Sequence, residues 1–167
     1  MPTRGMILTL LLLVLLSLVN CSSKTSLTTQ PASLPSGTVV GYDGCISLQL
    51  LASTSDCLDW EYTSEGTLEI RHVGAGFNCC PGEIYADITI TGEEIVIEER
   101  EQESACDCLC IFNVEYEVTN LKPGKYEIRV IEPYLRGEDE PLVCAIDVTM
   151  SSSGKCCAER NHYPWTY

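Results

Sequence analysis

Cysteine is the residue type with the most chemistry open to it in this chain. The sequence of 167 residues contains eleven cysteines and only two histidines. Five of the cysteines lie in two short motifs, Cys79-Cys80-Pro81 and Cys106-Asp107-Cys108-Leu109-Cys110. Thiols in such motifs can form disulfides in an oxidising compartment or, as thiolates, hold a soft metal ion such as Zn²⁺ or Cu(I). The compartment of the protein therefore bears directly on its chemistry.

The N-terminus indicates that compartment. Arg4 precedes an almost unbroken run of Leu, Ile and Val at residues 6–19, which ends at Asn20-Cys21. This run is shorter than the ~20 apolar residues that span a bilayer, and a basic start before it is typical of a secretory signal. The segment resembles a bacterial lipoprotein signal peptide, which implies that Cys21 becomes the lipidated first residue of the mature chain. Ser22, rather than Asp, after the cysteine resembles the pattern for sorting to the outer membrane.

One residue departs from the lipoprotein pattern. Gly, Ala or Ser usually precedes the lipidated cysteine, and this chain has Asn20 there. An ordinary signal peptide cleaved near Ser22 or Ser23, which would give a secreted protein, is the alternative. In both cases the mature chain enters an oxidising compartment. We predict an extracytoplasmic protein, anchored by lipid to the cell membrane or outer membrane or else secreted.

Without Cys21 the cysteines form an even set, and in a secreted domain an even set predicts a disulfide framework. Residues i and i+2 of a strand lie about 6.6–6.8 Å apart at Cα, with side chains that point the same way. The cysteines of the C-x-C-x-C motif are therefore expected to have partners elsewhere. The candidates are Cys45, Cys57, Cys79, Cys80, Cys106, Cys108, Cys110, Cys144, Cys156 and Cys157.

Sequence order narrows the pairing only in part. The nearest partners for the C-x-C-x-C motif are Cys79, Cys80 and Cys144, and Cys45 and Cys57 are candidates to join each other. Near the C-terminus, Cys156-Cys157 leaves three alternatives open: a vicinal disulfide, a bridge back to the body of the domain, or free thiols.

The alternative to disulfides is a metal site formed by Cys79, Cys80, Cys106, Cys108 and Cys110. On a straight strand the Cα atoms of Cys106 and Cys110 would be ~13 Å apart, whereas zinc thiolates lie within ~2.3 Å of the ion. The motif also lacks the paired C-x₂-C spacing of zinc ribbons. The spacing therefore favours disulfides and no cofactor, unless the chain bends at residues 107–109.

Charge and motifs exclude several functions. From Cys21 onward the chain has nine Lys and Arg against 24 Asp and Glu, a net charge of −15. Such a charge argues against binding nucleic acid or anionic lipid. No G-x-S-x-G, H-E-x-x-H or phosphate-binding loop is present. His72 and His162 are interpreted as structural or solvated, and the acidic groups at Asp56 and Glu98-Glu99 as chance, so we predict no enzyme and no catalytic residue.

The elements that must position the cysteines are short β-type runs separated by turn residues, which predicts an all-β sandwich. The expected strands are residues 38–42, 45–51, 58–62, 67–73, 84–91, 94–99, 109–118, 124–131 and 142–150. Residues 1–20 form the signal peptide, 21–37 a Ser/Thr-rich tether, 38–150 the sandwich, and 151–167 a tail containing cysteines and aromatic residues. From Cys106 to Val118 even-numbered positions are apolar or cysteine, so the three thiols are expected on the core face.

The run Leu121-Lys122-Pro123-Gly124-Lys125-Tyr126 resembles the tyrosine corner of Greek-key sandwiches of the immunoglobulin and fibronectin type III kind. The resemblance implies a sandwich of about 7–9 antiparallel strands and carries no activity. Together with the cysteine motifs, it resembles uncharacterised bacterial lipoproteins with immunoglobulin-like domains. We therefore predict a lipid-anchored binding or structural module of the cell envelope, whose partner is an envelope or surface protein.

Overall fold

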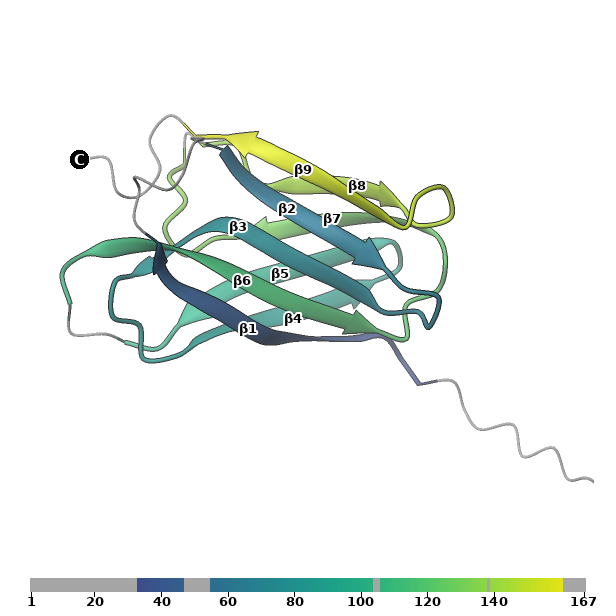
Figure 1. Ribbon diagram of the computed structural model, residues 1–167, viewed down its shortest axis with the longest axis horizontal. Helices are drawn as coiled ribbons and strands as arrows, with labels where there is room; N and C mark the ends of the chain where they lie inside the picture. The colour runs from purple at the N-terminus through teal and green to yellow at the C-terminus, as the bar shows by residue number, and fades with distance from the viewer. Residues whose placement is uncertain (1–32, 47–54, 104–105, 138, 161–167) are drawn as a thin grey trace, which may run out of the picture. The chain divides into compact units, whose positions relative to one another are not determined.

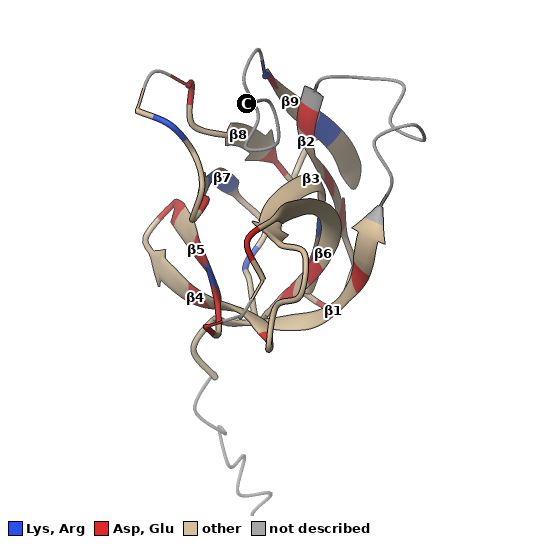
Figure 2. Ribbon diagram, turned by 90° about the vertical axis from the view of Figure 1, so that its left-hand side faces the viewer, with Lys and Arg blue, Asp and Glu red and all other residues tan. Residues whose placement is uncertain are grey.

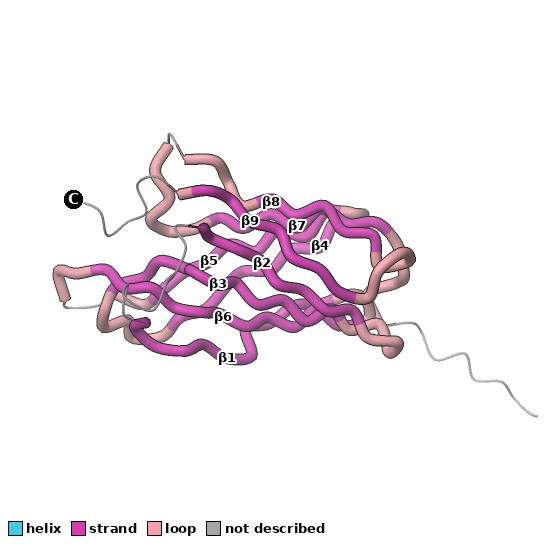
Figure 3. Tube along the Cα trace, turned by 45° about the horizontal axis from the view of Figure 1, so that its top comes forward, coloured by secondary structure: helices cyan, strands magenta, loops and turns pink. Residues whose placement is uncertain are grey.

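The computed structural model describes residues 33–46, 55–103, 106–137 and 139–160, and these fold into nine β-strands (Figure 1). The strands are β1 (Ser36–Ile46), β2 (Ser55–Tyr62), β3 (Leu68–Asn78), β4 (Ile84–Thr91), β5 (Glu94–Glu101), β6 (Leu109–Thr119), β7 (Lys125–Ile131), β8 (Val143–Asp147) and β9 (Ser153–Glu159). Figure 3 shows strand and loop throughout this part of the chain. No helix formed by the described residues is long and apolar enough to cross a membrane. The predicted signal peptide and Cys21 lie outside the described residues.

The strands form two stacked sheets. One has five strands in the order β1-β6-β3-β2-β9, and the other has four in the order β4-β5-β7-β8. The inward side chains alternate along each strand, as with Ile95 and Ile97 on β5 and Val114 and Val118 on β6, and they form one buried core. The prediction of an all-β, two-sheet protein is confirmed.

The prediction that all strands are antiparallel is wrong at one place. β5 and β7 are parallel, with Ile95 opposite Ile128 and Ile97 opposite Val130. The reason lies in the connection between them, because β6 belongs to the other sheet. The chain crosses from β5 to β6 and returns to β7 in the original direction, as parallel neighbours require a crossover.

Both ends of the predicted domain also differ. β1 continues through residues 43–44, which were expected to separate two strands, and its pairing is irregular between Val39 and Gly41. Residues 47–51 of the second expected strand lie outside the described residues. β9 lies in the segment predicted to be a tail, and it pairs with β2 from Ser153 to Glu159. The sequence Ser-Gly-Lys-Cys-Cys-Ala-Glu has little apolar alternation, so the pairing with β2 rather than local pattern makes it a strand. His162 and the aromatic residues after it lie outside the described residues.

The connection from β6 to β7 is held by hydrogen bonds. The Tyr126 hydroxyl donates to the carbonyl of Lys122 at 2.7 Å, a bond of the kind that a tyrosine corner makes. The Leu121 N–H donates to the carbonyl of Gly66, and the Leu121 carbonyl accepts from the Tyr62 hydroxyl at 2.8 Å. Gly66 has a φ of +83°, which favours glycine. These bonds attach the corner to the β2–β3 turn.

Candidate functional site: bridged cysteines and a buried ionic cluster

The ten cysteines from Cys45 onward are joined in five disulfides. The pairs are Cys45–Cys110, Cys57–Cys157, Cys79–Cys108, Cys80–Cys106 and Cys144–Cys156. The predicted disulfide framework is therefore confirmed. Every cysteine of the C-x-C-x-C motif has its partner outside the motif, as predicted.

The expected pairing of Cys45 with Cys57 is wrong. β1 and β2 are separated by β6 and β3 in the five-stranded sheet, so Cys45 instead bonds to Cys110 on the neighbouring β6. Cys57 bonds to Cys157, which is directly opposite on β9 with 4.0 Å between the two Cα atoms. Of the three alternatives for Cys156-Cys157, the structure shows bridges back to the body of the domain, because Cys156 bonds to Cys144 and Cys157 bonds to Cys57.

Cys144 is also not a partner of the C-x-C-x-C motif. It is fully buried on β8 and bonds to Cys156 on β9. β8 and β9 are edge strands of different sheets. This disulfide therefore ties the two sheets together at one side of the sandwich.

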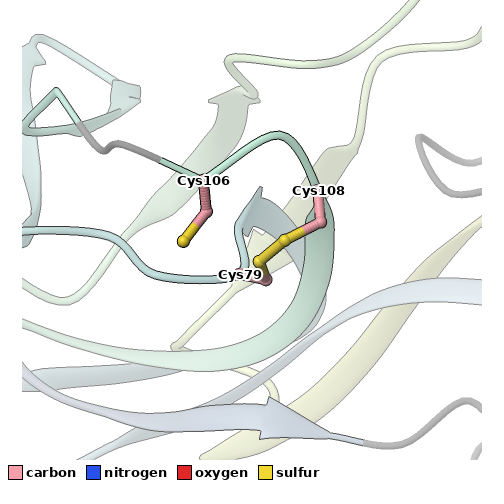
Figure 4. A group of neighbouring side chains, drawn as sticks. All are labelled: Cys79, Cys106 and Cys108. Carbon is pink, nitrogen blue, oxygen red and sulfur yellow. A yellow bond between two sulfur atoms is a disulfide. The ribbon is translucent and has the colours of Figure 1, made fainter.

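Two disulfides lie side by side where the β3–β6 pairing ends, and we call Cys79, Cys80, Cys106 and Cys108 the end cluster. β3 and β6 pair as far as Asn78 and Leu109, and the Cys79 N–H donates to the Cys108 carbonyl beyond that point. The sulfurs of Cys79, Cys106 and Cys108 all lie within 4.8 Å of one another (Figure 4).

The prediction that the C-x-C-x-C thiols continue the core face of a straight strand is wrong. Cys106 and Cys108 precede β6 and are exposed, and Cys110 is half-buried. The fully buried face begins only with Ile111 and Phe112. Disulfides to Cys79 and Cys80 draw the chain toward the end of β3, so alternation does not extend through residues 106–108.

A second group, which the sequence analysis did not predict, lies inside the sandwich. Its members are charged side chains that are buried together with a tyrosine hydroxyl, and we call them the ionic cluster. They are Asp56 on β2, His72 on β3, Glu99 on β5, Tyr116 on β6, Glu132 after β7 and Arg160 after β9. Because these elements belong to both sheets, the cluster links the two sheets across the core.

His72 lies between two carboxylates. Its Nε2 is 2.5 Å from Asp56 Oδ1, and its Nδ1 is 2.6 Å from Glu99 Oε1. Two carboxyl groups at these distances favour the protonated ring, in which both nitrogens are donors. Burial acts to lower the pKa of His72, but the charges of Glu99 and Asp56 raise it well above its usual value.

Arg160 binds the other side of the cluster. Its Nη2 is 2.5 Å from Asp56 Oδ2 and 2.7 Å from Glu132 Oε1, and its Nη1 donates to the carbonyl of Glu140. Burial acts to raise the pKa of Asp56, but His72 and Arg160 together lower it below its usual value. Asp56 thus accepts from both cations of the cluster.

Tyr116 completes the cluster by donating its hydroxyl to Glu99 Oε1. Burial, and then the charge of Glu99, raise the pKa of Tyr116 well above its usual value, so the phenol stays protonated. Glu99 Oε2 is buried and has no hydrogen-bond partner among the described residues. The cluster thus brings three acidic side chains, one histidine, one arginine and one phenol together inside the core.

Asp56, His72 and Glu132 each place one atom suited to metal binding within 4.8 Å of the others. Nη2 of Arg160, however, already donates to both Asp56 and Glu132. The side chains of all three acidic residues, of His72 and of Arg160 are at most 3% exposed. This arrangement stabilises charge within the core and presents no group to solvent.

Part of this cluster carries a signal in the sequence. Asp56 shares its parity with Leu58 and Trp60, and Glu99 shares its parity with Ile95 and Ile97. Strand alternation therefore places both carboxylates on inward positions. The interpretation of these groups as chance acidic residues missed that signal.

Asp and Glu outnumber Lys and Arg in the chain, and they lie on strands of both sheets (Figure 2). On the five-stranded sheet a shallow groove of about 420 Å³ is lined by Glu61, Glu69, Glu115 and Glu117 together with Arg71. Arg71 is held by Asp43 at 3.0 Å and Glu115 at 3.6 Å. The groove therefore presents an excess of carboxylates.

Comparison of the chain with protein families, with curated proteins and with solved structures found no match.

Proposed function

We propose that this protein is a lipid-anchored, extracytoplasmic β-sandwich that serves as a binding or structural module of the cell envelope. The observation that carries the proposal is the pairing of ten cysteines in five disulfides. Such a framework forms and persists in oxidising compartments. Cys21 is the one cysteine outside the framework, and it follows the apolar leader, where a lipid would be attached.

An immunoglobulin-like relationship is part of this proposal. It is supported by the two stacked sheets and by the hydrogen bond from Tyr126 to Lys122. The parallel pairing of β5 and β7 differs from the two antiparallel sheets of immunoglobulin domains. We therefore propose a variant of that architecture rather than its common strand order.

A binding role would use the outside of the sandwich, because the inside is filled by apolar side chains and the ionic cluster. The groove that contains Glu69 and Glu117 is lined by five acidic side chains and one arginine. Its charge favours an envelope or surface protein with a basic contact region, through electrostatic complementarity.

Mass measurement of the intact protein isolated from cells tests the proposal. We expect a diacylglyceryl adduct on Cys21. No thiol should react with the alkylating reagent until the protein is reduced, and after reduction the ten thiols of the five disulfides should react. The matched control is Cys21→Ser, which should lose the lipid mass and the membrane association but keep all five disulfides. A mature chain that begins near Ser22 and carries no lipid would contradict the lipid anchor and support a secreted protein instead. Free thiols before reduction would contradict the disulfide framework.

A second candidate function is thiolate metal binding by the end cluster. The observation that favours it is the proximity of the sulfurs of Cys79, Cys106 and Cys108, with Cys80 bonded to Cys106. If both bridges were reduced, four thiolates would be close enough to surround one Zn²⁺ or Cu(I). Cys110 is bonded to Cys45 and does not join this group. The same mass measurement would then show four free thiols and one bound metal ion.

A further inference from the structure

The end cluster places one disulfide directly beside another. The sulfur of Cys106 belongs to the Cys80–Cys106 bridge, yet it lies within 4.8 Å of both sulfurs of the Cys79–Cys108 bridge (Figure 4). Thiol–disulfide exchange requires a thiolate that can reach a neighbouring disulfide sulfur. Opening Cys80–Cys106 would therefore create a nucleophile already next to its target.

The Cys80–Cys106 bridge is exposed at Cys106, as the Cys79–Cys108 and Cys45–Cys110 bridges are at Cys108 and Cys45. Cys106 and Cys108 are exposed, whereas Cys144 of the Cys144–Cys156 bridge is fully buried. The rate of attack by an external thiolate depends on access to the disulfide sulfur. An external thiol is thus expected to reach Cys106 much sooner than Cys144.

We propose that the end cluster is a thiol–disulfide exchange site that accepts two electrons from a dithiol protein. This inference rests on the oxidised, extracytoplasmic form proposed above. It goes beyond that form, because it gives two of the five disulfides a chemical role in addition to stabilising the fold.

In the first step one thiolate of the dithiol partner attacks the sulfur of Cys106. The Cys80–Cys106 bond breaks, its electron pair leaves on Cys80, and a mixed disulfide joins the partner to Cys106. The second thiol of the partner then loses its proton and attacks the partner's first sulfur, which is bonded to Cys106 in the mixed disulfide. This releases Cys106 as a thiolate. The partner is oxidised to a disulfide, and Cys80 and Cys106 are reduced.

In the second step the Cys106 thiolate attacks the sulfur of Cys79. A Cys79–Cys106 bond forms, the Cys79–Cys108 bond breaks, and the electron pair leaves on Cys108, which then takes up a proton. Attack on Cys108 itself is less favourable, because only Asp107 separates it from Cys106 and so short a loop fits disulfide geometry poorly. The two electrons that entered at Cys80–Cys106 now reside on Cys80 and Cys108.

The product keeps the fold connected. A Cys79–Cys106 bridge still joins the end of β3 to the segment before β6, as the original bridges do. The Cys108 carbonyl can keep its hydrogen bond from the Cys79 N–H, because exchange changes only the side-chain bonds. Exchange therefore exposes a new thiol at Cys108 without releasing either strand.

Two matched variants test the proposal in purified, oxidised protein. Cys80→Ser leaves Cys106 as the free thiol, and Cys106→Ser leaves Cys80 as the free thiol. After incubation at about pH 8, where cysteine thiols begin to ionise, the samples are quenched, alkylated and mapped without reduction. We expect alkylation of Cys80→Ser to divide between Cys106 and Cys108, with a new Cys79–Cys106 peptide. In Cys106→Ser the alkylation should stay on Cys80, because the Cys80 sulfur does not belong to the group of sulfurs from Cys79, Cys106 and Cys108 that lie within 4.8 Å of one another.

The wild-type protein gives an independent measurement if a variant fails to fold. Limited treatment with dithiothreitol, used as the dithiol probe, should open Cys80–Cys106 at least about tenfold faster than Cys144–Cys156 and yield Cys79–Cys106. Equal opening rates with only the five original pairings would overturn the proposal, as would a Cys80→Ser protein alkylated only at Cys106. The lipid and thiol masses of protein from cells would not change with either result, so the proposed function and this inference can fail separately.

Discussion

Replacing Asp56 by asparagine is the most direct perturbation of the ionic cluster. The side chain is buried, and its two oxygens accept from His72 Nε2 and Arg160 Nη2, both at 2.5 Å. The asparagine side chain would keep the shape but lose the charge. Its amide nitrogen, which is a donor, would lie against the N–H group of either His72 or Arg160. Removing one member of a buried, hydrogen-bonded ion pair costs about 3–5 kcal/mol. We expect the free energy of unfolding of Asp56→Asn to fall by that amount.

The same strand offers a matched control. Asp59 is on the opposite face of β2, 41% exposed, with Lys155 Nζ at 3.0 Å. An exposed ion pair of this kind contributes at most about 1 kcal/mol, so Asp59→Asn should be nearly neutral. The two variants carry the same chemical change on one strand and differ in burial and partners.

Urea unfolding with the disulfides intact measures both variants. With a slope of about 2 kcal/mol per molar urea, a loss of 3–5 kcal/mol lowers the midpoint by about 2 M. The slope itself should stay unchanged, so that the shift reports stability alone. An Asp56→Asn midpoint within about 0.5 M of wild type, or no lower than that of Asp59→Asn, would refute the role given to the cluster.

Individual side chains give three further predictions. The pKa of His72 is raised in the folded state, so the histidine contributes fully to the free energy of unfolding below pH 6.5. This contribution declines as the pH rises through the folded pKa, and urea midpoints should therefore fall over the alkaline range. Burial, followed by the hydrogen bond to Glu101, raises the pKa of Tyr134 to about 12, and Glu101→Gln should lower it in an ultraviolet titration. A Cβ on Gly154 would lie 2.7 Å from the Trp60 ring, so Gly154→Ala should cost about 1–3 kcal/mol and alter tryptophan fluorescence.

Each of these has its own check. The alkaline decline should disappear in His72→Phe, and a wild-type midpoint that is flat from pH 6.5 to 9 would contradict the charged histidine. Tyr134→Phe should remove the late-titrating phenol that Glu101→Gln shifts. Ser153→Ala, at an exposed position beside Gly154, should leave stability and fluorescence unchanged. If it destabilises the protein as much as Gly154→Ala does, contact with Trp60 is not the cause.

The strands within the core were predictable because their side chains alternate. Residues 84–91 were predicted as one strand and are observed as β4, and the apolar face of β6 from Phe112 to Val118 follows the parity read from the sequence. β9 was not predictable in this way. Its residues gain their strand conformation from pairing with β2, and a local pattern does not record such a partner.

By itself the sequence determined the β character of the chain, the existence of a disulfide framework and the inward positions of Asp56 and Glu99. Alternation and an even cysteine count are local or compositional properties, so they can be read without knowing which strands are neighbours. The tertiary structure decided the partners. Sheet order places Cys45 beside Cys110 rather than Cys57, and the stacking of the two sheets brings His72 between two carboxylates that are 43 positions apart in the chain. Contacts between distant segments depend on the whole topology, and that is why both the disulfide pairing and the ionic cluster emerge only in three dimensions.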